Sequence, residues 1–138
     1  MPQDSPLAAS LERVGDRWML LIVDALMAGP RRFNDLADDV EGIAPNILSS
    51  RLKRLSSEGI VLARPYSRRP MRFSYELTAS GRELAGALRL LADWGARAAG
   101  GDPIRHADCG TPMEARWYCP TCSRVVADDE AESELHYL

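Results

Sequence analysis

A chain of 138 residues has the length of one domain, with room for a small extension. Its composition, 46% hydrophobic and 27% charged residues, is that of a folded globular protein and excludes disorder along the whole chain. The longest strongly apolar run, Trp18 to Val23, is far shorter than the roughly 20 residues that cross a bilayer. We therefore expect a soluble, cytoplasmic protein with no membrane contact.

The formal net charge of −3 hides a strong segregation of charge. Residues 51–72 contain seven basic residues and one acidic residue, a local charge of +6. Residues 100–138 contain three basic and eight acidic residues, a local charge of −5. A local block of cations is what a phosphate-binding surface needs, although a solvated cationic face has the same composition. The secondary structure expected around residues 51–72 distinguishes these two interpretations.

Apolar residues in the first part of the chain recur at helical spacing between glycine turns. The expected helices are residues 6–14, a second helix from an N-cap at Asp16 to Gly29-Pro30, residues 33–40, and residues 44–57. On the last of these helices, Leu48, Leu52 and Leu55 form one narrow apolar stripe. One face of this helix is therefore expected to be buried.

The other face of the 44–57 helix is polar. At about 100° per residue, six polar side chains point away from the leucine stripe: Asn46, Ser49, Ser50, Lys53, Arg54 and Ser57. Small hydroxyls allow close approach to a surface, and Asn, Lys and Arg can donate to base edges and phosphates. A purely structural helix can have this pattern too. Its position after a short helix and a turn at Gly42 favours a helix-turn-helix, whose second helix enters the major groove of DNA.

Two strands are expected next, at residues 60–66 and 71–77, and together they predict a hairpin. Its tip, Ser67 to Pro70, contains Arg68 and Arg69. A hairpin directly after a recognition helix is a wing, and its basic tip can meet the DNA backbone or the minor groove. The alternative is a solubilising loop.

A long helix is expected at residues 79–99, with Thr78 as its N-cap. Its apolar face is wider than one small domain needs, which favours a homodimer interface. A dimer would place two recognition helices about 34 Å apart. Packing of this face on the chain's own core is the alternative.

The three cysteines and one histidine form two pairs with metal-ligand spacing. His106 and Cys109 make one pair, Cys119 and Cys122 make the other, and nine residues separate the pairs. This spacing is typical of a zinc ribbon, with zinc or iron bound by all four side chains. Four protein ligands leave no open position, so a structural metal is favoured over a catalytic one. The alternatives are a metal sensor and a dithiol redox pair at Cys119-Pro-Thr-Cys122.

Gly100 to Pro103 marks a change in composition and suggests a domain boundary. We predict a mainly α (α+β) fold in two parts. Residues 1–99 form a winged helix-turn-helix domain with a two-stranded wing and a long dimerisation helix. Residues 100–138 form a small zinc-ribbon-like extension.

Five segments, in order, resemble the HxlR-type (MarR-like) winged-helix transcriptional regulators of bacteria. They are Gly15 to Trp18, Gly29 to Leu36, Ile43 to Leu52, Glu58 to Val61, and Tyr75 to Gly81. The resemblance covers roughly two thirds of the chain. It implies a homodimer that binds an operator through the helix around Asn46 to Arg54 and through the Arg68-Arg69 wing. It also implies that Arg32 contacts a phosphate.

The resemblance has one departure. Many members of this family carry a cysteine before the N-terminal proline, and some use it for redox sensing. Here Ser5-Pro6-Leu7 occupies that place, so thiol sensing by this route is not expected. The metal-binding extension resembles tails of some members only.

The leading hypothesis is a dimeric transcriptional regulator, a repressor, that binds double-stranded DNA and answers to a small-molecule effector of unspecified chemistry. The predicted DNA contacts are Arg32, Asn46, Ser49, Ser50, Lys53, Arg54, Arg68 and Arg69. The alternatives are a metal-sensing regulator and a zinc-ribbon adaptor whose winged helix binds protein. No nucleophile with a base and no open metal site is apparent, so an enzyme is not expected.

Overall fold

The computed structural model describes residues 5–127, 129 and 130. The chain divides into two compact units, Met1–Arg89 and Leu90–Leu138. This division falls inside a helix, ahead of the boundary predicted at residues 99 and 100. The outer ends of the two predicted domains, residues 1–4 and 131–138, lie outside the described part. Among the described helices, none is long and apolar enough to cross a membrane.

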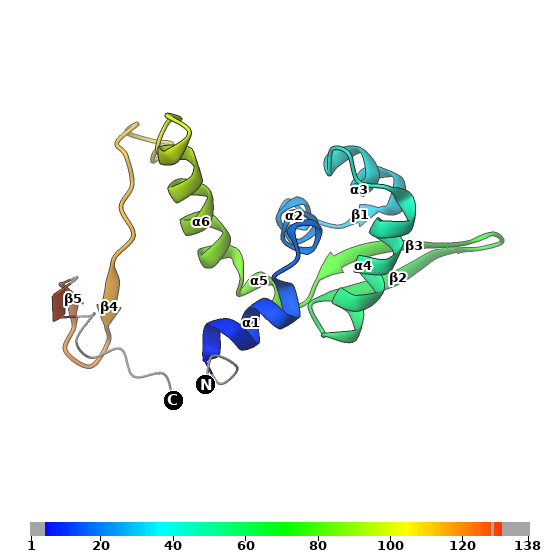
Figure 1. The fold of residues 1–138 in the computed structure, drawn as a ribbon, viewed down its shortest axis with the longest axis horizontal. Helices are drawn as coiled ribbons and strands as arrows, with labels where there is room; N and C mark the ends of the chain where they lie inside the picture. The colour runs from blue at the N-terminus through cyan, green and yellow to red at the C-terminus, as the bar shows by residue number, and fades with distance from the viewer. Residues whose placement is uncertain (1–4, 128, 131–138) are drawn as a thin grey trace. The chain divides into compact units, whose positions relative to one another are not determined.

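Four helices build most of the first unit (Figure 1). They are α1 Pro6–Val14, α2 Arg17–Leu26, α3 Phe33–Asp39 and α4 Pro45–Ser57, close to the predicted ranges. The Ser5 hydroxyl caps α1 by accepting from the Ala8 N–H at 3.0 Å. The Asp16 carboxylate caps α2 by accepting from the Trp18 N–H at 2.8 Å. Gly42 has a φ of +81°, so glycine suits the tight turn that joins α3 to α4.

A three-stranded antiparallel sheet completes the winged domain. Its strands are β1 Arg31–Arg32, β2 Val61–Arg68 and β3 Met71–Leu77, in the order β1-β3-β2. The hairpin of β2 and β3 is longer than predicted, because Ser67 pairs with Arg72 and Arg68 pairs with Met71. The predicted four-residue tip is therefore wrong, and the turn consists of Arg69 and Pro70. No sequence pattern indicates β1, which has only two residues.

The helix predicted at residues 79–99 is two helices, α5 Ala79–Arg82 and α6 Ala85–Ala98. Thr78 caps α5 as predicted, with its hydroxyl accepting from the Gly81 N–H at 3.1 Å. At Glu83 and Leu84 the backbone forms i→i−3 hydrogen bonds to Ser80 and Gly81, both of 3.2 Å. Such bonds tighten a helical turn and interrupt a continuous α-helix. The prediction of one long helix is wrong for this reason.

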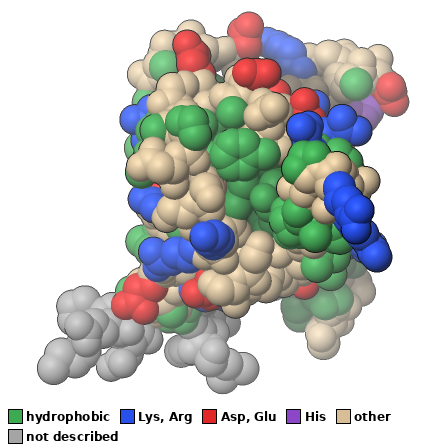
Figure 2. Space-filling model, turned by 90° about the vertical axis from the view of Figure 1, so that its right-hand side faces the viewer, with side chains coloured by type: hydrophobic (Ala, Val, Ile, Leu, Met, Phe, Trp, Pro, Cys, Tyr) green, Lys and Arg blue, Asp and Glu red, His purple; other side chains and the backbone are tan. Residues whose placement is uncertain are grey.

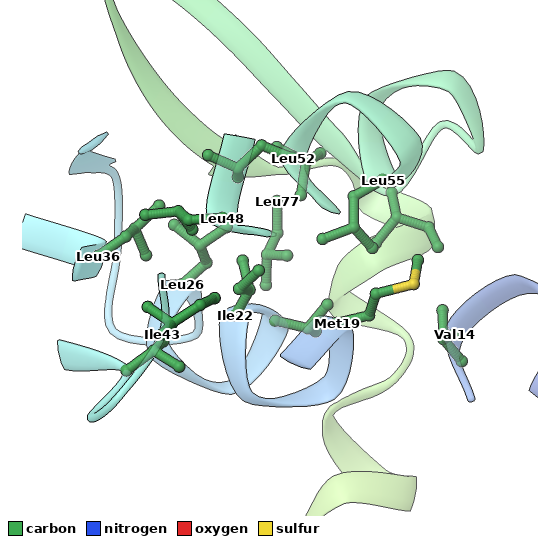
Figure 3. Packing of buried hydrophobic residues seen from close by; sticks show 14 residues of the cluster. Val14, Met19, Ile22, Leu26, Leu36, Ile43, Leu48, Leu52, Leu55 and Leu77 are labelled. Atoms are coloured by element: carbon green, nitrogen blue, oxygen red, sulfur yellow. The ribbon is translucent and has the colours of Figure 1, made fainter. Parts of the chain in front are cut away.

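The core of the winged domain lies where α2 packs on α4 and β3, and where α4 packs on β2 (Figure 3). Leu36, Leu48 and Leu55 are completely buried, as is Ile22 on α2. Leu77 brings the C-terminal end of β3 into the same cluster. The stripe predicted from leucine spacing on α4 therefore faces the core, and the opposite face of that helix is left to solvent.

The second unit contains a short hairpin after α6. Its strands are β4 Trp117–Cys119 and β5 Arg124–Val126, which pair antiparallel. An isolated bridge joins Arg105 to Pro112 further upstream. This unit thus contains two consecutive turns, one between Arg105 and Pro112 and one between β4 and β5.

One ion pair links the start of α2 to α4. Arg51 Nη2 lies 3.1 Å from Asp16 Oδ2, and both side chains are about one quarter to one third exposed. The hydrogen bond from Arg51 holds the pKa of Asp16 below its ordinary value of 3.8. Asp16 thus combines two roles, since it caps α2 and anchors α4.

We expect Asp16→Asn to lower the free energy of unfolding at pH 7 by up to about 1 kcal/mol. Asn caps a helix about as well as Asp, so the substitution removes mainly the charge. Because the pKa of Asp16 is lower in the folded chain, its contribution is present above the unfolded pKa and is lost as pH falls through the folded pKa. Urea unfolding at several pH values should show wild type and variant converging below about pH 4. A constant difference down to about pH 2 would contradict the pairing.

Candidate nucleic-acid interface

The outward face of α4 has a polar centre and two flanks. Asn46, Ser50, Lys53 and Ser57 fall within an arc of about 60°, opposite the buried leucines, and all four are exposed. Ser49 lies on one flank and is half-buried. The central four are therefore the side chains of α4 that a surface lying against this helix would meet first.

Arg54 lies on the other flank of α4 and is exposed, but its guanidinium is engaged. Arg54 Nη2 donates to the carbonyl of Glu12 on α1 at 2.6 Å. This partner is far away in the sequence, so helical periodicity could not reveal it. Arg54 ties α4 to α1 in this structure, whereas Lys53 points from the polar centre.

The wing presents Arg68 and Arg69 at its tip, and both are exposed. The tip projects away from the helices on a long two-stranded hairpin (Figure 1). Arg64, lower on β2, forms an ion pair with Glu76 on β3. Cations at the end of an extended hairpin can follow a polyanionic backbone without a cost of burial. Arg68 and Arg69 thus lie at the end of the wing, as the sequence predicts, although the turn itself has only two residues.

Arg32 stands at the N-cap of α3 and is exposed. Its guanidinium carbon lies 4.5 Å from the ring centroid of Tyr66 on β2, a cation–π contact. Its backbone N–H donates to Asp35 Oδ2 at 3.1 Å. Tyr66 gave no signal in the sequence, because its role depends on the pairing of β1 with the wing. The stacking holds Arg32 beside the wing.

The predicted metal ligands lie in the two turns of the second unit. His106 Nδ1 is 3.3 Å from Cys109 Sγ, and Gly110 has a φ of +71°, which favours glycine in this turn. In the second turn the Cys122 N–H lies 3.5 Å from Cys119 Sγ. A backbone N–H directed at the first sulfur of a Cys-x-x-Cys turn favours a thiolate there. The members of each pair are therefore close to one another.

The two pairs themselves do not form one cluster. Within the described residues, no group of three or more His, Cys, Asp or Glu side chains is placed to hold a metal ion. Hydrogen bonding by Thr111, joined by the contact with His106, lowers the pKa of Cys109 to about 7. The Cys122 backbone lowers the pKa of Cys119, and the hydrogen bond with Cys119 raises the pKa of Cys122. The metal site stays a prediction.

A short helix, a turn, a second helix with a polar outer face and a following two-stranded hairpin define a winged helix-turn-helix protein. This is a class of transcriptional regulators with a DNA-binding fold. The chain belongs to the HxlR-like helix-turn-helix family, whose sequence model matches residues 13–102.

Relatives and solved structures agree with this assignment. An uncharacterized HTH-type transcriptional regulator of Mycobacterium tuberculosis is 40% identical over 122 residues, which cover 85% of this chain and 77% of that protein. The structure of a putative transcription factor from Pseudomonas aeruginosa is 31% identical, with a TM-score of 0.71 over 97% of this chain and 92% of that one. The putative HTH-type transcriptional regulator YtcD has a TM-score of 0.65 at 31% identity, covering 70% of this chain and 98% of its own.

These findings confirm the predicted family, the winged-helix fold of mixed α and β structure, and the function in transcription regulation. The relatives are regulators and not enzymes, as predicted. The eight predicted DNA contacts stay predictions. Seven of them are exposed, and the eighth, Ser49, is half-buried.

Proposed function

We propose that this chain is a homodimeric repressor that inserts α4 into the major groove of an operator and lays its wing tip on the adjacent backbone. The observation that carries the proposal is the exposed polar centre of α4 directly opposite its buried leucine stripe. Lys53 and Asn46 can donate to base edges, and Ser50 allows close approach. Arg68 and Arg69 add the sequence-independent attraction to phosphate.

Two helices supply the apolar surface that a dimer needs. On α1, Leu7 is 69% exposed and Leu11 is 52% exposed. On α6, Trp94 is 65% exposed beside the exposed Leu90 and Leu91, and no residue of this helix is buried. Only Leu88 of this helix packs against the core, and it is half-buried. An amphipathic helix that leaves most of its apolar face exposed favours a partner helix. A two-fold dimer would present two α4 helices to an inverted repeat.

Repression is the simplest consequence of operator binding, because a dimer that covers a promoter blocks access without further contacts. The test is genome-wide recovery of DNA bound to the purified full-length protein. We expect enrichment of a short inverted repeat, and higher transcript levels of the adjacent genes when the protein is deleted. Failure to enrich any DNA at low salt would favour the adaptor hypothesis instead.

Replacing Lys53 by Ala should weaken operator binding by about 1 to 3 kcal/mol if its amine reads a base. Replacing Arg68 and Arg69 together by Ala should weaken binding to all DNA sequences. The slope of log K against log salt concentration should become shallower by about one for each phosphate that is no longer neutralised. Arg89→Ala removes one exposed cation outside α4 and the wing, and serves as the control. Fluorescence anisotropy at several salt concentrations measures these effects. Unchanged binding in both sets of variants would contradict the proposed docking.

A second proposal concerns the second unit, in which His106, Cys109, Cys119 and Cys122 would hold one structural zinc ion. Two observations favour it: each pair occupies its own tight turn, and one imidazole with three thiols is a common zinc donor set. The two turns must approach one another for all four side chains to bind one ion. Zinc would fix these turns in a segment that has few apolar contacts of its own, and with four protein ligands it would have no open position.

We expect the purified chain to carry about one zinc per chain, and Cys119→Ser to lose most of it. Loss of the ion should expose the segment 102–127 to proteases, because metal binding and folding are coupled in such small units. Thr121→Ser, between the two cysteines, is the matched control and should retain zinc. Elemental analysis and limited proteolysis measure both effects. A native chain that binds no zinc under reducing conditions would contradict this proposal, and if chelation alters DNA binding the metal is sensory.

A further inference from the structure

A cavity of about 540 Å³ opens between the N-terminal end of α3 and the two strands of the wing. Its volume lies in the range of roughly 300 to 1,000 Å³ that is typical of small-molecule sites. The cavity lies where the short strand β1 ends. β1 pairs with β3 at Tyr75 and Ser74, and at Phe33 the chain turns away into α3, which leaves space beside Met71 to Phe73.

The charges around this cavity favour an anion. Arg32 and Arg72 both line it, against one acid, Asp35. Asp35 already accepts the backbone N–H of Arg32. Arg72 is exposed and has no ion-pair partner among the described residues, whereas Arg64 on the neighbouring strand is paired with Glu76. A guanidinium without a partner next to a cavity is available to a carboxylate or phosphate.

The rings around the cavity favour a flat aromatic body. Tyr66, Phe73 and Tyr75 line it together with Arg32 and Arg72. The contact of Arg32 with the Tyr66 ring places a planar cation against an aromatic face. Burial raises the pKa of Tyr75 above its ordinary value of 10. The face from which the wing projects shows hydrophobic side chains beside Lys and Arg side chains (Figure 2).

We infer that this cavity binds a small aromatic anion, with the ring against Tyr66 and Phe73 and the anionic group between Arg32 and Arg72. The ligand class is a planar ring that carries a carboxylate or a phosphate. For regulation the inference rests on the proposed function, because Arg32 is also a predicted phosphate contact. A ligand that engages Arg32 then competes with DNA for it.

The test uses the full-length protein without DNA, so it does not depend on the operator. Isothermal titration calorimetry compares 1-naphthoate with its neutral counterpart 1-naphthalenemethanol, and AMP with adenosine. We expect one of the two anions to bind with a Kd below about 1 mM, and its neutral counterpart to bind at least about tenfold more weakly. Binding of 1-naphthoate assigns the site to aromatic carboxylates, and binding of AMP assigns it to nucleotides.

Arg72→Gln should weaken binding of the anion at least about tenfold. Arg64→Gln removes the same charge from the same hairpin outside the cavity, and should bind as the wild type does. Phe73→Ala should weaken binding of the anion and binding of its neutral counterpart to a similar extent. Absence of binding by either anion up to about 1 mM, or equal affinity of wild type and Arg72→Gln, would overturn the inference. If the chain binds DNA, the ligand should lower DNA affinity in the wild type and not in Arg72→Gln, while a chain that binds the ligand but no DNA would count against the proposed function alone.

Discussion

Replacing Leu48 by Ala should destabilise the winged domain by about 3 to 5 kcal/mol. Leu48 is completely buried on the inner face of α4, beside Leu36 and Leu26 (Figure 3). The truncation removes buried methyl groups and leaves a cavity that the surrounding helices can close only partly. Urea unfolding followed by circular dichroism measures the loss.

Ser50→Ala, on the outer face of the same helix, is the control for this prediction. Ser50 is exposed, and its hydroxyl accepts only a surface hydrogen bond from Arg51 at 3.2 Å. We expect its unfolding free energy to stay within about 0.5 kcal/mol of the wild type. A loss below about 1 kcal/mol for Leu48→Ala would mean that α4 does not pack as described.

Gly81→Ala should lower the free energy of unfolding by about 3 kcal/mol or more, at least as much as Leu48→Ala. A Cβ at residue 81 would lie 2.3 Å from the carbonyl oxygen of Ile60 and 3.2 Å from side-chain atoms of Ile60 and Leu77. The carbonyl of Ile60 cannot move freely, because it accepts the backbone N–H of Thr78 at 3.0 Å. The substitution therefore forces α5 away from the end of the wing. Thermal and urea unfolding both measure it.

Gly86→Ala is the matched control for Gly81→Ala. No atom outside the helix lies within 4 Å of the position of its added Cβ, and Gly86 is in a helical turn of α6. Alanine is a better helix former than glycine by about 1 kcal/mol, so this variant should be neutral or more stable. Equal stability of Gly81→Ala and wild type would show that α5 does not approach Ile60 this closely.

The first four helices were predictable from the sequence because their signals are local. Ser5 and Asp16 are cap residues, Gly42 supplies a positive φ, and the leucines of α4 recur at helical spacing along one face. Each signal acts within a few positions along the chain. The polar centre of α4 follows from the same periodicity, since the face opposite a buried stripe meets solvent.

Other features could not be predicted because their causes lie far apart in the sequence. β1 is a strand only because Arg31 and Arg32 pair with Tyr75 and Ser74 of β3, in a distant part of the chain. The attachment of Arg54 to Glu12 and the stacking of Arg32 on Tyr66 likewise join separate elements. The close approach of Gly81 on α5 to Ile60 also joins residues that lie far apart in the sequence. No periodicity within one helix contains this information.

The sequence by itself determined the family, the order of the helices, the inner and outer faces of α4 and the basic character of the wing tip. These properties depend on residue types at fixed local spacing. The tertiary structure decided which basic residues are engaged, where the wing turns, and that a cavity lies beside Arg32 and Arg72. These properties depend on which side chains are brought together when β1, α3 and the wing pack against one another, and that packing is not local.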